Sequence, residues 1–295
     1  MLIKNMTITN SRGDSISFGR QFKLIDDFDT SNLQAQLNYH DTTGDGSLYY
    51  NTVLENRPIT IPFFIEKFDP SPTWYEEQRA ETFRVINPKF NPMRIDIETR
   101  GGKSYFIKAN AESTPAYPKG FENDNRAWAK GFIYLDCGDP YFYESVATVV
   151  NMGNWIPNLE FPLEIPESGI EVGYYSNSLI HNAINSGAVD TGMLIRFIAR
   201  NTVVKPSLTD VNTYENLVIN TTMQAGDVIE VSTFANDKTV TLIRDNIRTN
   251  IFNTVTLDSE FLQLYPGDNL FRYDAQEGLD YLEVSISYNN KYVGV

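Results

Sequence analysis

Two segments of different composition meet at Leu135-Asp136-Cys137-Gly138-Asp139-Pro140-Tyr141-Phe142-Tyr143. The run before it, 131–135, is apolar and aromatic, which is typical of a strand. Pro140 fixes its own φ and keeps Asp139 out of a helical conformation, so the chain turns here. We therefore predict one domain over 1–140 and a second, tethered domain over 141–295, with a tight turn inside a single domain as the alternative.

The charge of the chain changes at the same place. Lys and Arg number 24 against 38 Asp and Glu, a net charge of −14. Residues 1–140 hold 16 basic and 19 acidic side chains, net −3, whereas residues 141–295 hold 8 and 19, net −11. Such acidity argues against nucleic-acid binding, which needs a basic surface. It also keeps crowded copies of a protein apart.

Cysteine content and terminal sequence bear on the compartment. Cys137 is the single cysteine, so we expect no intrachain disulfide. The start of the chain lacks the basic and apolar regions of a signal peptide. No run approaches the roughly 18 apolar residues of a membrane span. We expect a protein that is made and folded in a cytoplasm and does not enter a membrane.

The first domain is predicted to be mostly β with one helix. The strand Arg57–Ile65 carries two prolines, which places it at a sheet edge. Ser71 is a good N-cap and Pro72 suits the first helical position, and Asn87-Pro88 should end that helix. Together these signals predict a small β domain with a helix packed on it.

A polar stretch, 38–47, lies between the early strands. Its order Asp41-Thr42-Thr43-Gly44-Asp45-Gly46 imitates the start of an EF-hand calcium loop. The bidentate Glu of such a loop would fall at Thr52, and no helical pattern flanks the stretch. We interpret it as a mobile contact loop and predict no metal there.

The second domain carries many short strands separated by turns. Tyr265-Pro266-Gly267-Asp268 fits a type II turn. In the last strand, Leu282–Tyr288, apolar and polar side chains alternate. Short strands at regular spacing without a helix predict an antiparallel β-sandwich.

The chain offers little that could carry chemistry. His40 and His181 have no partner at metal-ligand spacing, and no phosphate-binding glycine loop or nucleophile elbow occurs. Cys137 is interpreted as a small packed residue at the junction. Trp128 and Trp155 could stack on sugar rings, although aromatics more often fill β cores. We predict no catalytic residue, no metal and no cofactor.

Six short features carry a family resemblance through their order along the chain. The features are a hairpin around Gly13, the strand Arg57-Pro58-Ile59-Thr60-Ile61, the junction Asp139–Tyr143, Gly226-Asp227, Leu264-Tyr265-Pro266-Gly267-Asp268-Asn269 and Tyr288–Tyr292. With them the whole chain resembles the distal tail proteins of long-tailed phages, mainly those that infect Gram-positive hosts.

The resemblance implies a split β-barrel-like domain with one helix, followed by a galectin-like β-sandwich. It implies a structural virion protein, a homohexameric ring that joins the tail tube to the tail-tip or baseplate proteins, such as a tail-associated lysin or a receptor-binding protein. It carries over no catalytic residue. Some relatives hold an inserted carbohydrate-binding module, and no stretch here is long enough to be one.

In such a ring the nearly neutral first domains should pack side by side and line the lumen, with the acidic second domains apart on the outside. A monomeric carbohydrate-binding or adhesin-type module is the alternative, and a flavin enzyme lacks a phosphate-binding cluster. Unpaired strand edges and polar loops are natural docking surfaces. The candidate subunit-interface residues are Arg57, Ile59 and Ile61 in the strand and Gly44, Asp45 and Gly46 in the loop; the domain-junction residues are Cys137, Asp139, Pro140 and Tyr141.

Overall fold

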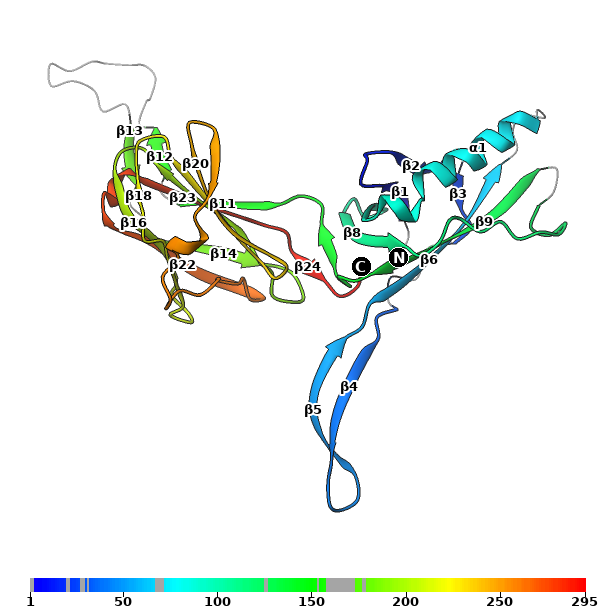
Figure 1. Cartoon of the computed structure of the whole chain (residues 1–295), viewed down its shortest axis with the longest axis horizontal. Coiled ribbons are helices and arrows are strands. Elements are labelled where there is room, and N and C mark those ends of the chain that lie inside the picture. Colours follow the sequence, from blue (N-terminus) through cyan, green and yellow to red (C-terminus); the bar gives the residue numbers. More distant parts are fainter. Residues whose placement is uncertain are drawn as a thin grey trace. The chain divides into compact units, whose positions relative to one another are not determined.

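The computed structural model describes residues 3–19, 22–26, 30, 32–66, 72–124, 127–152, 154–157, 173–176 and 179–295. The chain packs as two compact units (Figure 1). The first unit holds residues 1–146 together with 291–295, and the second holds residues 147–290. The fold is mainly β, and the described residues contain a single α-helix.

Seven strands of the first unit form a closed, barrel-like sheet in the order β8-β7-β1-β2-β3-β6-β9, which a pairing of β8 with β9 completes. Beyond β8 the sheet continues through β10 to β24. This confirms the predicted split-barrel class. The bounds are β1 Ile3–Thr9, β2 Ser15–Phe18, β3 Phe22–Leu24, β6 Arg57–Glu66, β7 Met93–Thr99, β8 Ser104–Ala111, β9 Trp128–Cys137, β10 Phe142–Glu144 and β24 Lys291–Tyr292.

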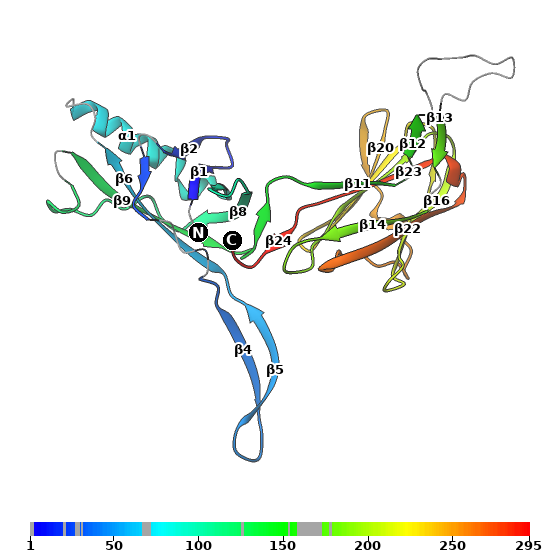
Figure 2. The same cartoon turned by 180° about the vertical axis from the view of Figure 1, so that it is seen from behind.

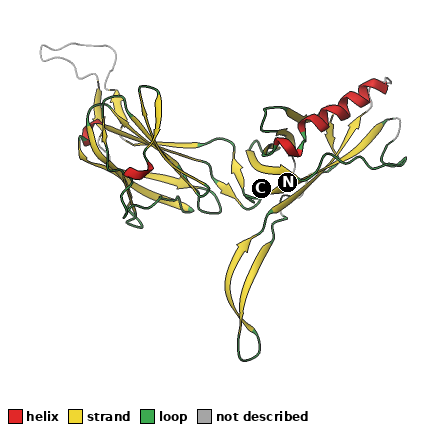
Figure 3. Cartoon of the chain, viewed as in Figure 1, coloured by secondary structure: helices red, strands yellow, loops and turns green. Residues whose placement is uncertain are grey.

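The helix α1, Pro72–Val85, packs its last turn onto the barrel core (Figure 3). Val85 and the following Ile86 are fully buried, and Trp74 is partly buried against the same core. The helix ends two residues before the predicted Asn87-Pro88, and a 3₁₀ turn, Pro88–Phe90, follows with Asn87 as its cap. The predicted N-cap, Ser71, lies outside the described residues.

The predicted mobile loop is wrong, because its residues belong to a long β-hairpin. Strands β4, Ala35–Asp41, and β5, Ser47–Leu54, pair along their whole length, and only residues 42–46 turn. The Thr42 hydroxyl donates to the carbonyls of Gly44 and Gly46 at 3.1 and 2.8 Å, and Gly46 has φ +89°. The polar residues thus form a tight turn rather than an irregular loop.

The strand predicted at a sheet edge, β6, lies at an edge over only part of its length. It pairs with β9 from Arg57 to Glu66, and Phe63–Ile65 also pair with β3. Within the described residues, Arg57–Ile61 have a strand neighbour on one side alone. The strand accommodates Pro58 and Pro62 because a proline lacks the backbone N–H but keeps its carbonyl. The Pro62 carbonyl accepts from the Ile25 N–H at 3.0 Å.

The second unit is the predicted β-sandwich. One sheet has the order β11-β23-β15-β19-β20-β21 and the other β14-β22-β16-β17, with β18 paired to β16. A separate pair, β12 and β13, joins neither sheet. The bounds are β11 Thr148–Met152, β12 Asn154–Pro157, β13 Gly173–Ser176, β14 Ile180–Asn185, β15 Leu194–Ala199, β16 Val203–Asp210, β17 Asn216–Val218, β18 Thr222–Met223, β19 Val228–Phe234, β20 Asp237–Arg244, β21 Ile247–Asn250, β22 Gly267–Glu277 and β23 Leu282–Tyr288, with 3₁₀ turns at Phe252–Thr254 and Leu279–Tyr281.

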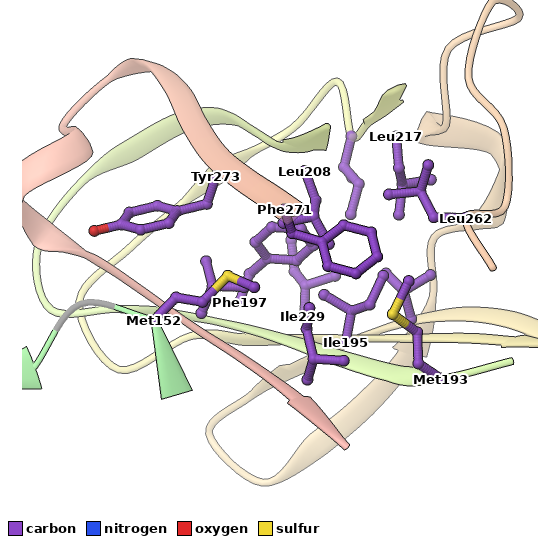
Figure 4. Close-up of a cluster of buried hydrophobic side chains, with 14 of the residues drawn as sticks. Met152, Met193, Ile195, Phe197, Leu208, Leu217, Ile229, Leu262, Phe271 and Tyr273 are labelled. Atoms are coloured by element: carbon purple, nitrogen blue, oxygen red, sulfur yellow. The ribbon is translucent and has the colours of Figure 1, made fainter. Parts of the chain in front are cut away.

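Inward-facing side chains of the two sheets form the core of the second unit (Figure 4). Phe197 on β15 and Ile229 on β19 come from the six-stranded sheet, and Leu208 on β16 and Phe271 on β22 come from the five-stranded sheet. All four are fully buried. In β23 the alternate apolar side chains point inward, as the period-two pattern predicts.

The chain crosses between the units twice, after Val146 and after Asn290. Residues 141–146 and 291–295 pack with the first unit, which the sequence did not predict. Independent folding of 1–140 and 141–295 stays a prediction, and the first unit of the structure also includes both additional segments.

Candidate assembly interface

The β4–β5 hairpin exposes nearly all its side chains. Every residue of β5, and every residue of β4 except Asn38, is exposed. Leu48 is 64% exposed and Tyr50 67%, although such side chains are usually buried. Figures 1 and 2 show the hairpin from opposite sides, extending away from the barrel of the first unit.

Both faces of this hairpin are apolar and aromatic. On one face Tyr39 and Tyr49 pair across the strands with ring centroids 6.0 Å apart, and the Tyr49 hydroxyl lies 2.6 Å from the Thr52 hydroxyl. A bulge after Asn38 places Tyr50 on the other face, where its ring lies 4.9 Å from His40. The exposed large apolar side chains are Leu37, Tyr39, Tyr49 and Leu54 on the first face and Leu48, Tyr50 and Val53 on the second.

Such a hairpin indicates a contact surface. A two-stranded hairpin without a buried face is at best marginally stable in water. Large apolar side chains gathered on an exposed surface mark interaction sites. Residues 35–54 contain no Lys or Arg, and Asp41 and Asp45 near the turn give the hairpin a small negative charge. A partner surface that is apolar and uncharged or basic would fit it.

The predicted interface residues divide into two groups. Gly44, Asp45 and Gly46 lie exposed at the tip of the hairpin. Arg57, Ile59 and Ile61 are at most 2% exposed, and their side chains lie in the barrel core. A neighbouring molecule could therefore contact only the backbone edge of this part of β6 and the exposed side chains of Pro58 and Thr60.

Arg57 is the largest fully buried side chain of the described residues, at the base of the hairpin. Its Nε donates to the Pro140 carbonyl at 2.8 Å, its Nη1 to the Thr30 carbonyl and its Nη2 to the Val293 carbonyl. Its guanidinium carbon also lies 5.0 Å from the centre of the Phe142 ring. Charge-assisted bonds of this kind are the stronger ones in proteins.

The domain-junction residues form a packed turn within the first unit. The Asp139 carboxylate accepts from the Tyr143 hydroxyl at 2.5 Å and lies 3.5 Å from the Tyr141 N–H. Burial, and then the hydrogen bond to Asp139, raise the pKa of Tyr143 well above its ordinary value. Pro140 is buried with its carbonyl turned to Arg57. Cys137 lies in the barrel core.

The thiol of Cys137 should be unreactive in the folded protein. Burial, followed by the nearby Asp136 carboxylate, raises its pKa to about 12. The thiolate is the reactive form, so labelling at pH 8 should be about 1000-fold slower than in the denatured chain. Kinetics with a thiol reagent would check this, and the native rate should keep rising beyond pH 10. Rapid labelling at pH 8 would contradict the assignment.

The variant Cys137→Ala should lower the free energy of unfolding by about 1 kcal/mol, chiefly through lost packing.

The other residues singled out in the sequence lie outside the hairpin. The Trp128 ring lies edge-on to Phe64, at 6.3 Å between centroids, which uses it for packing. The side chain of Trp155 lies outside the described residues. His181 lies 6.4 Å from the Tyr273 ring. Among the described residues no group of three His, Cys, Asp or Glu side chains is placed to hold a metal ion. Within the same residues no helix has the length and hydropathy to span a membrane.

The polar turn 42–46 makes the hairpin hard to recognise from the sequence, although the strand before it shows part of the expected pattern. Leu37 and Tyr39 alternate with Asn38 and His40, whereas the consecutive Leu48-Tyr49-Tyr50 after the turn does not alternate. The sequence therefore carries only the first half of the signal that predicts a hairpin. Burial of Arg57 was also predictable, since it shares the parity of Ile59, Ile61 and the other inward residues of β6.

Comparison with known proteins agrees with this architecture. Residues 186–292 match the family described as the siphovirus-type tail component, C-terminal domain. One similar solved structure is the crystal structure of the SPP1 Dit (gp 19.1) protein, which is described as a paradigm of the hub adsorption apparatus in Gram-positive-infecting phages. It matches with a TM-score of 0.69 at 11% sequence identity, and the match covers 97% of this chain and 98% of that chain. A chain of the phage P2 baseplate in its activated conformation with Ca gives 0.53 over the whole of both chains, also at 11% identity. No curated protein sequence matches the chain.

Both structural matches span the two units, so the whole chain shares the fold of these two solved phage proteins. The predicted resemblance is confirmed. The family match supports a structural component of a phage tail or baseplate.

Proposed function

We propose that this chain, whose residues 186–292 match the siphovirus-type tail component family, is a non-enzymatic hub that forms a homohexameric ring at the distal end of a phage tail. The ring joins the tail tube to tail-tip or baseplate proteins, such as a tail-associated lysin or a receptor-binding protein. The observation that carries the proposal is the β4–β5 hairpin, a two-faced apolar surface on a closed barrel.

A closed ring needs a heterologous contact, in which one patch meets a different patch on the next copy. The hairpin is the donor patch, and the turn residues Gly44, Asp45 and Gly46 form its far end. The acceptor is the backbone edge of β6 over 58–61, which has a strand neighbour on one side alone among the described residues and exposes the side chains of Pro58 and Thr60. Strand edges are common docking sites because their N–H and C=O groups lack partners.

Charge sets the arrangement within the ring. Residues 1–140 carry −3, so six first units can pack together with little repulsion, whereas residues 141–295 carry −11 each. We place the first units around the lumen and the second units outside. The protein acts in the virion, at the tail tip, after assembly in the host cytoplasm.

Images of the protein mixed with its tail tube partner test the proposal. We expect a six-fold ring with the second units outside, and native mass measurements that give six copies. The isolated protein can be a monomer, because a neighbouring ring of the tube supplies part of the closing surface. A fixed dimer under every condition, or a ring with the second units inward, would contradict the proposal.

A further inference from the structure

The base of the hairpin and both connections to the second unit converge on one side chain. Thr30 precedes the hairpin strands and Arg57 follows them, while Pro140 precedes β10 and Val293 follows β24. The Arg57 guanidinium donates to the carbonyls of the other three. These partners are 27, 83 and 236 residues away along the chain.

None of the three carbonyls belongs to a strand ladder, since Thr30, Pro140 and Val293 all lie outside strands. Hydrogen bonds from Arg57 therefore hold these three segments together, as backbone pairing between strands does elsewhere in the unit. A guanidinium holds five donors in a fixed planar arrangement, so the position of one carbonyl constrains the positions of the others. A fully buried charge strengthens this constraint, because an unbonded carbonyl or cation would be costly there.

The two connecting strands are bound to each other beside the same guanidinium. In β10 and β24, Phe142 pairs with Tyr292 and Tyr143 with Lys291. The Phe142 ring lies under the guanidinium, and the Tyr292 ring lies edge-on to Tyr105 at 5.5 Å. The Thr30 hydroxyl adds a direct bond of 2.8 Å to the Val295 carbonyl. Movement of one connection would therefore disturb the other and the hairpin base.

We propose that Arg57 is a positioning residue that couples the base of the β4–β5 hairpin to β10 and β24, the two strands that carry the second unit. Docking of the hairpin would then change the order of both connecting strands. The coupling is a property of the single chain, so its test does not depend on ring formation.

Hydrogen exchange of the full chain, followed by mass spectrometry, tests the coupling. In Arg57→Met we expect at least 10-fold faster exchange in peptides over 32–36 with 53–56, over 140–146 and over 291–295. The Glu55 N–H, which donates to the Gln34 carbonyl at 3.0 Å, is the reporter at the hairpin base. Peptides of β1 and β7 should change by less than 2-fold. Arg57→Lys, which keeps the charge but has fewer donors, should fall between.

A second variant shows whether the segments act through Arg57. Tyr292→Ala, which weakens β24, should speed exchange at Glu55 by at least 5-fold in the wild-type background and add little in Arg57→Met. Arg94→Met is the matched control, since Arg94 also stacks on a ring, that of Phe106 at 3.9 Å, but is exposed. Additive effects of the two changes, or an unchanged hairpin base in Arg57→Met, would overturn the proposal. If Arg57→Met does not fold, the comparison is made with Arg57→Lys: Tyr292→Ala should speed exchange at Glu55 less in the Arg57→Lys background than in the wild type, and an equal response in the two backgrounds would overturn the proposal.

Discussion

Gly278→Ala is expected to destabilise the second unit by about 3–5 kcal/mol, because strain and overlap add at this site. Gly278 has φ +79°, a left-handed conformation, and it precedes the 3₁₀ turn Leu279–Tyr281. A Cβ there would lie 2.2 Å from the Thr202 carbonyl oxygen and 3.3 Å from the Val203 Cα. The backbone cannot retreat easily, since β16 begins at Val203 and pairs with both β18 and β22.

Thermal and denaturant unfolding of the full chain measure this effect. At about 2–4 °C per kcal/mol for a unit of this size, the unfolding midpoint should fall by about 10 °C. Gly226→Ala is the matched control, since Gly226 has φ +90° but no atom lies within 4 Å of the place that an added Cβ would take. It should cost only about 1–2 kcal/mol from backbone strain. Equal losses in the two variants would show that the Thr202 contact does not matter.

Local patterns predicted the elements whose two faces differ in environment. In β23 one face lies in the sandwich core and the other at the surface, so the alternation of Leu282–Tyr288 is clean. The helix was placed nearly correctly because Pro72 and Asn87-Pro88 restrict the backbone directly. The same logic predicted the sandwich from its short strands.

Non-local contacts account for what the sequence did not predict. The barrel closes through β8 and β9 at Asn110 and Ala111, and β24 joins β10 from far along the chain. Neither pairing leaves a local signature, because each depends on where the rest of the sheet brings the strand. The hairpin was missed for the opposite reason: apolar side chains on both of its faces hide the alternation that marks a half-buried strand.

The hairpin variants Tyr39→Asp with Tyr49→Asp, and Leu48→Asp with Tyr50→Asp, are expected to abolish ring formation. Each pair places two charges on one apolar face, where the proposed neighbour would desolvate them. Interface tyrosines of this kind each contribute about 2 kcal/mol or more. Loss of Tyr39 and Tyr49 should weaken each contact by about 1000-fold, and loss of Leu48 and Tyr50 by at least about 30-fold. The fold should persist, because all four side chains are exposed in the chain.

Imaging of rings together with sedimentation, in the presence of the tube partner, measures the effect for each face separately. Unfolding midpoints within about 2 °C of the wild type would show that assembly alone has changed. Tyr214→Asp serves as the control, since Tyr214 is 83% exposed in the second unit, outside the hairpin. Loss of rings in one face's variant but not the other's would assign the buried face, since only the face that meets the neighbour is desolvated. Rings that persist in both variants would exclude the hairpin as the donor patch and leave the backbone edge of β6 as the remaining contact.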